Sequence, residues 1–368
     1  MNLRKAFAIS ALVGISFPTA VHAQLAEMPT LGTIDFFGLQ IPESEAVELL
    51  PFKVGEAMED VIGRVTDPES KPQGFAEMFG AKHATMQFVC CNADQLTMAY
   101  IGLADSDEPT VAFREPPIGE IFLPEDMVRK YNLSMEYLFE AVKNPQGPED
   151  LSQGHSLVSY PPLREIQESF IVEATDSQVL LIRVLHDSID PEHRFVAAHI
   201  LGYAADKKAV TPELVFAVTD SNTTVRNNAT RAIGVIAAYA NMNPQLGIEI
   251  EGGVFVDMLN SLNWTDRNKG LMVLNSLSRA RNADLLAALR MRALNSLIEM
   301  RAWKNLGHAE AACRILVRIL GLPEQDELHP RKLTLAHARE LEAKQKTKYL
   351  IVGAMAATEL SVCNWLVS

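Results

Sequence analysis

The chain has 368 residues, of which 48% are hydrophobic and 21% are charged, and its net charge at pH 7 is −13. This length predicts more than one domain, and the composition excludes a wholly disordered chain. Four cysteines in a chain of this length exclude a disulfide-dense scaffold.

The N-terminus has the pattern of an export signal. Arg4 and Lys5 precede an apolar run over residues 6–17, and Ala23 provides a small residue at a cleavage position. We therefore expect residues 1–23 to be a cleaved signal peptide and the mature protein to be periplasmic or secreted. The alternative is a short buried N-terminal helix. The run is too short to anchor the protein stably in a membrane.

The acidic excess is confined to one part of the chain. Residues 24–150 contain 8 Lys and Arg against 23 Asp and Glu, whereas residues 151–368 contain 23 of each. A negative electrostatic potential repels phosphate backbones and anionic lipid surfaces, so nucleic-acid binding is not expected. The change in charge balance near residue 150 predicts a domain boundary.

The segment over residues 24–110 is predicted to be a small α+β domain. Its apolar patterning and turn residues predict an order of strand, helix, helix, strand, strand. The expected elements are a strand over 33–38, helices over 44–50 and 58–65, a further helical turn over 75–79, and strands over 84–90 and 95–101.

This element order resembles a POTRA module. The resemblance covers about residues 32–104 and depends on Gly38 after the first strand and on the phrase LPFKVGE at residues 50–56. The chain departs from the family in an insertion around residues 67–74 and in carrying a single module. The resemblance implies a periplasmic interaction domain that binds extended partners by adding a strand at a sheet edge. An unrelated α+β domain of the same order is the alternative.

Residues 111–174 are rich in proline and turn residues, and we interpret them as a connector with one helix over residues 125–143. A repeated phrase then appears, in which the helix-opening arginines Arg194, Arg226 and Arg267 lie 32 and 41 residues apart. This spacing is close to the roughly 40-residue period of two-helix repeats. Polar Asp and Asn turns precede each phrase and provide caps for the second helix of each pair.

These phrases resemble HEAT repeats, and they predict an all-α HEAT-like solenoid over residues 175–321. A fourth pair, over 283–303 and 307–321, fits by helix length but lacks the arginine phrase. Residues 322–368 are predicted to form C-terminal capping helices. A non-repeating helical bundle is the alternative. Such stacks of repeats present an extended concave surface to partners.

The best candidates for a ligand-binding face open successive second helices of this solenoid. Guanidinium groups suit carboxylates, and asparagine side chains can hold a peptide backbone. The competing interpretation, which we favour for Arg226, is that the arginines join adjacent repeats through turn aspartates such as Asp220 and Asp266. The candidate binding residues are Arg194, Arg226, Asn227, Arg267, Asn268 and Lys269.

No motif in the chain predicts a catalytic, metal or cofactor site. The sequence contains no His-Glu-x-x-His helix, no phosphate-cradling loop and no Cys-x-x-Cys pair. Cys90 and Cys91 are expected at the end of a strand, where neighbouring side chains point to opposite faces. We therefore expect one in the core and the other idle or paired elsewhere. Sequence leaves the pairing of the four cysteines open.

The sequence thus predicts a multidomain protein, with an α+β module followed by a helical solenoid. The function that fits this architecture is an exported, non-catalytic scaffold for protein or peptide partners, without cofactors. The alternative is an enzyme of unknown reaction whose site lies at the junction of the two parts and uses Cys91 or His155.

Overall fold

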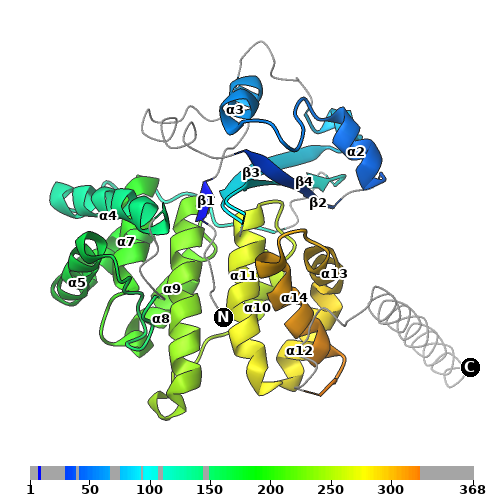
Figure 1. Ribbon diagram of the computed structural model, residues 1–368. Coiled ribbons are helices and arrows are strands. Elements are labelled where there is room, and N and C mark those ends of the chain that lie inside the picture. Colours follow the sequence, from blue (N-terminus) through cyan, green and yellow to red (C-terminus); the bar gives the residue numbers. More distant parts are fainter. Residues whose placement is uncertain are drawn as a thin grey trace, which may run out of the picture.

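The computed structural model describes residues 7–9, 30–38, 41–66, 75–92, 94–106, 111–143 and 149–323. A small sheet with two helices lies near the N-terminus, and a mostly helical part follows it (Figure 1). This order confirms the expected α+β segment followed by a helical segment. Most of the predicted signal peptide and of the predicted C-terminal capping helices lies outside the described residues. Within the described ranges, no helix is both long enough and apolar enough to cross a bilayer.

The sheet has the strand order β1-β3-β4-β2. Strand β4 pairs with β3 antiparallel and with β2 parallel. Because parallel neighbours need a crossover connection, the helices α2 and α3 lie between β2 and β3 in the chain. The bounds are β1 Phe7–Ile9, β2 Leu31–Phe37, α2 Glu43–Leu49, α3 Met58–Thr66, β3 His83–Cys90 and β4 Thr97–Ala104, with a short 3-10 turn at Glu77–Phe79.

Both faces of the sheet are covered. Ala99 and Ile101 of β4 belong to a core shared with α2 and α3, whereas Met98 and Tyr100 belong to the core of the helical part. This alternation follows from the two-residue period of a strand. It also explains why β4 is buried along nearly its whole length. Figure 1 shows the sheet lying across one end of α11, with α2 and α3 on its other side.

Helices that alternate in direction make up the rest of the described chain. Their bounds are α4 Glu125–Lys143, α5 Pro161–Asp176, α6 Gln178–Asp187, α7 Pro191–Leu201, α8 Lys207–Ala217, α9 Thr223–Met242, α10 Gly253–Met258, α11 Trp264–Leu277, α12 Ala283–Arg292, α13 Leu294–Arg301 and α14 Leu306–Ile319. The sequence did not predict α5, because its opening Pro161-Pro162 indicates a turn. Proline is tolerated in the first turn of a helix, where the missing N–H has no intrahelical partner.

Six of these helices begin at an Asp or Asn cap, among them the second helices α7, α9, α11 and α14. The side-chain oxygens of Asp190, Asn222, Asn263 and Asn305 accept hydrogen bonds from backbone N–H groups at the starts of α7, α9, α11 and α14. Each cap satisfies donors that have no partner within the helix. The turns that the sequence indicated therefore do set the starts of the second helices.

The second helices α7, α9, α11 and α14 pack side by side, while α6, α8 and α10 pack behind them. Close approach at α10 depends on Gly270, where an added Cβ would lie 3.1 Å from the Met258 Cβ. We call the side of α7, α9 and α11 that faces away from α6, α8 and α10 the inner face. The segment over residues 149–158 packs against α9, since Glu149 forms an ion pair with Arg231 of that helix at 2.6 Å.

Candidate functional site

The three arginines of the repeated phrase are buried in ion pairs. Arg194 donates from Nε and Nη2 to the Asp220 carboxylate at 2.9 and 3.0 Å. Arg226 binds the Asp266 carboxylate in the same two-point manner, at 3.0 and 2.7 Å. The side chains of both pairs are at most 3% exposed. These guanidinium groups therefore have no free side for a ligand.

Each arginine joins its own helix pair to the next pair along the chain. Arg226 on α9 reaches Asp266 on α11, and its Nη1 also donates to the backbone oxygen of Asp220 at 2.8 Å. Arg267 on α11 reaches Glu299 on α13 at 2.9 Å. These contacts agree with the interpretation that the three arginines join adjacent repeats. They do not agree with a ligand-binding role for the three side chains.

The other candidate residues lie differently. Asn227 lies one turn before Arg231 on the inner face of α9, and Asn268 and Lys269 occupy the matching region of α11. Their side chains are buried or half-buried. We call Asn227, Arg231, Asn268 and Lys269 the inner-face cluster. Arg231 was not predicted, although its position four residues after Asn227 on the same helix face was a usable signal.

Hydrogen-bonding capacity in the inner-face cluster is largely unused. The Asn227 Oδ1 atom is buried without a hydrogen-bond partner, while its Nδ2 donates to Asn228 Oδ1 at 3.3 Å. Asn268 is 7% exposed. Within the part of the chain that the structure describes, neither the Asn268 amide nor the Lys269 ammonium makes a hydrogen bond. Native proteins rarely leave buried polar groups unpaired, and Asn227 Oδ1 is one of several such atoms among the described residues.

Charge in the cluster is only partly compensated. Arg231 donates to Glu149 Oε1 at 2.6 Å, so its charge has a counter-ion. Burial, together with the nearby charge of Arg231, lowers the pKa of Lys269 to about 7. An anion that approached Lys269 would raise this pKa again.

A small cavity of about 30 Å³ lies on the other side of Arg231. It is bounded by α7, α9 and the segment over residues 149–158, and it includes His155 and His199. Burial and the charge of Lys207 lower the pKa of His155 to about 4, and burial and Arg231 lower the pKa of His199 to about 3. Both imidazoles are therefore neutral at pH 7. A cavity of this size is suited to one or two water molecules.

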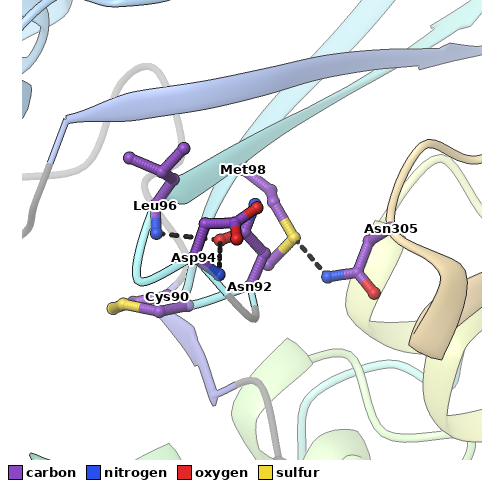
Figure 2. Close-up of a disulfide and its surroundings, with 7 residues drawn as sticks. Cys90, Asn92, Asp94, Leu96, Met98 and Asn305 are labelled. Atoms are coloured by element: carbon purple, nitrogen blue, oxygen red, sulfur yellow. Dashed lines mark hydrogen bonds between the residues drawn. A yellow bond between two sulfur atoms is a disulfide. The ribbon is translucent and has the colours of Figure 1, made fainter.

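Cys90 and Cys91 are joined to each other by a disulfide (Figure 2). This corrects the expectation that they would separate between core and surface. The physical reason is that β3 ends at Cys90, so the strand alternation does not extend to Cys91. The turn that follows is held by Asn92, whose Oδ1 accepts from the N–H groups of Asp94 and Leu96 at 3.0 and 2.9 Å.

This disulfide weakens the case for a thiol enzyme. Both sulfur atoms are bonded, so Cys91 offers no thiolate nucleophile. His155, the other residue of the enzyme hypothesis, borders the cavity on α7 and α9 and does not lie at the junction of the sheet with the helices. Cys313 is a free, buried cysteine, and Cys363 lies outside the described residues.

The junction itself is filled by aromatic side chains. Tyr100 of β4 stacks on Trp264 of α11 with ring centroids 4.7 Å apart, and Trp303 packs against its edge. The Tyr100 hydroxyl lies 2.6 Å from His308 Nδ1. Burial and the charge of Lys269 lower the pKa of His308 to about 3, so the imidazole is neutral. These contacts attach the sheet to the helices, and this attachment does not require a catalytic role for the residues at the junction.

A comparison with models of known protein families gives no match, and a search of curated protein sequences gives none either. No group of three His, Cys, Asp or Glu side chains within the described ranges is arranged to hold a metal ion.

Proposed function

We propose that this protein is an exported, non-catalytic scaffold that binds a protein partner on the inner face of a HEAT-like solenoid, with a POTRA-like module attached at one end. The observation that carries the proposal is the extended face formed by α7, α9 and α11, on which the buried Asn227 Oδ1 has no hydrogen-bond partner. Unpaired donors and acceptors of this kind are expected where a second molecule supplies the missing hydrogen bonds.

Two features support the HEAT-like part of the proposal. Arg194, Arg226 and Arg267 occupy equivalent places on α7, α9 and α11, and each contacts the next helix pair. The second helices also pack side by side, which creates an extended face. The position of β4 between β3 and β2, antiparallel to the first and parallel to the second, supports the POTRA-like part.

Site-specific photo-cross-linking tests where the partner binds. A photoreactive amino acid replaces Met272, which is 47% exposed on α11, three residues after Lys269. The matched control replaces Val179, which is 74% exposed on α6, a helix that packs behind the second helices. We expect a cross-linked partner from position 272 in the exported protein and none from position 179.

Two outcomes of the cross-linking experiment would contradict the proposal. If both positions give the same products, or neither gives one in the cell envelope, the inner face is not the binding surface. The intact mass of the exported chain tests export in the same sample. A mature protein that begins at Gln24 agrees with cleavage after Ala23, whereas a chain that still begins at Met1 would exclude the periplasmic assignment.

A further inference from the structure

We propose that the bond between Cys90 and Cys91 is a site of thiol–disulfide exchange, where the Cys-x-x-Cys dithiol of a partner protein reduces it. This inference goes beyond the scaffold function and does not depend on a partner at the inner face. The sequence itself contains no Cys-x-x-Cys pair, so the dithiol belongs to another protein.

The exchange has two steps, and its atoms and electrons balance. The first partner thiolate bonds to the Cys91 sulfur while the bond to Cys90 breaks, and the Cys90 thiolate leaves and takes up a proton. The second partner thiolate then bonds to the first partner sulfur, and the Cys91 thiolate leaves and takes up a proton. The two cysteines gain two electrons and two protons, and the partner dithiol that supplies them becomes a disulfide.

The first step of the argument is that this disulfide closes almost no chain. The stabilisation that a disulfide gives to a fold grows with the number of residues in the loop that it closes. Cys90 and Cys91 are adjacent, so no residue lies between them. Because the bond adds little to the stability of the fold, the fold in turn does little to oppose reduction of the bond.

The second step is that hydrogen bonds hold the turn after β3 independently of the sulfur atoms (Figure 2). The Asn92 N–H donates to the backbone oxygen of Leu96 at 2.9 Å, and Asn92 Oδ1 accepts from the N–H groups of Asp94 and Leu96. Next to the turn, Val89 of β3 pairs with Met98 of β4. We therefore expect the turn and the strand register to persist when the disulfide opens.

The third step is access. Cys90 and Cys91 are both half-buried, and Asp94 and Gln95 in the following turn are exposed. Cys90 packs against the core shared with α2 and α3, whereas Cys91 follows the end of β3, so the Cys91 sulfur is the one that an incoming thiolate attacks. The strand β1, which pairs with β3 at Cys90, lies within the expected signal peptide. Cleavage of the signal would therefore uncover this edge further.

The fourth step is the class of the reductant. Once a thiolate has attacked Cys91, the freed Cys90 thiolate lies on the neighbouring residue at a high effective concentration. It therefore expels a monothiol such as glutathione and re-forms the disulfide. A dithiol completes the reduction, because its second thiol attacks the first partner sulfur in the mixed disulfide.

The local sequence also favours the role of a substrate over that of an attacking thiol. A cationic neighbour lowers the pKa of a thiol and makes it a better nucleophile. Residues 88–98 contain no Lys, Arg or His, and they include Asp94. The pair is therefore suited to accept electrons from a dithiol of lower pKa.

Reduction of the folded, full exported chain by thioredoxin tests the proposal, with thioredoxin reductase and NADPH to regenerate the dithiol. Trypsin cleaves after Lys82 and Arg114, so Cys90 and Cys91 lie on one peptide that contains no other cysteine. Alkylation followed by mass spectrometry of this peptide reads its redox state. We expect the dialkylated peptide to form about tenfold or more faster than with glutathione at the same thiol concentration.

Two variants complete the test. Cys363→Ser keeps the pair and should be reduced at the wild-type rate. The double substitution Cys90→Ser and Cys91→Ser should leave the melting temperature within about 3 °C of wild type, because the bond is not needed to hold the fold.

Three results would overturn the inference. The first is that the wild-type chain is reduced only after urea has unfolded it, or not at all. The second is that glutathione reduces the folded chain as fast as thioredoxin does. The third is that the double variant melts more than about 8 °C below wild type or fails to fold, because the bond would then be a structural one. Reduction of the wild-type chain is measured without any substitution, so the first two results do not depend on how the variants fold.

Discussion

Neighbouring residues of the same repeated phrase lie in different environments in this molecule. Arg226 and Arg267 turn towards the next helix pair and become buried in ion pairs, whereas Asn268 and Lys269, one and two residues later, lie unpaired on the inner face. On a helix, consecutive residues point about 100° apart, so one step moves a side chain from a packed seam to an open face. Position within the repeat decides which polar residue is held in an ion pair and which is not.

The largest expected effect comes from breaking a packed ion pair. Arg226→Ala leaves the Asp266 carboxylate buried without its charged partner, and this should lower the free energy of unfolding by about 3–5 kcal/mol. Urea denaturation followed by circular dichroism measures the loss. The control Arg183→Ala removes an exposed arginine of α6 and should change stability by about 0.5 kcal/mol or less. Equal stability of the two variants would show that the pair does not join the repeats.

The next effect concerns the attachment of the sheet. Tyr100→Phe keeps the ring stacked on Trp264 but removes the hydroxyl that contacts His308, so we expect a loss of about 1–3 kcal/mol. Since Met98 and Tyr100 lie in the core of the helical part, we also expect wild type to unfold in one transition. This differs from the domain boundary that the change in charge balance predicts near residue 150. Two resolved transitions in a calorimetric scan would favour separable units after all.

The smallest effect is a pH dependence at the cavity. Burial holds the pKa of His199 at about 3, below its ordinary value of 6.5, so only the unfolded chain gains this proton between pH 6.5 and 3. Stability should therefore fall as the pH drops through that window, by about 1–2 kcal/mol from this group between pH 6.5 and 5. Comparing urea midpoints at pH 7 and pH 5 for wild type and His199→Gln isolates the contribution. A slope that is the same in both proteins would assign the acid sensitivity to other groups.

Much of the local structure was predictable because its causes are local. The caps Asn222 and Asn263 set the starts of α9 and α11 through bonds to the next two or three residues, and the sequence indicates such turns directly. The strand predicted over residues 95–101 corresponds to β4, Thr97–Ala104. In contrast, α5 was missed because Pro161 and Pro162 indicate a turn and a helix start equally well without knowledge of the packing around them.

The candidate site was predictable only in part. Sequence placed Asn227, Asn268 and Lys269 on one face, because helical spacing is fixed, but it could not separate them from Arg226 and Arg267 beside them. That separation depends on carboxylates such as Glu299, which lies 32 residues away in the chain. Arg231 was not predicted as a candidate residue for a related reason, because its counter-ion Glu149 lies 82 residues earlier in the chain.

The sequence by itself determined the order of the strands and helices over residues 31–104, the starts of α9 and α11 and the equivalence of the repeated phrases, since these depend on contacts within a few residues. Only the tertiary structure decided which cations are neutralised, that Cys90 bonds to Cys91, and that Tyr100 belongs to the core of the helices. Electrostatic pairing and burial depend on which distant side chains meet, and helical periodicity carries no information about that. For this reason the ion pairs of Arg226 with Asp266 and of Arg267 with Glu299 appear only after the neighbouring helices have been placed.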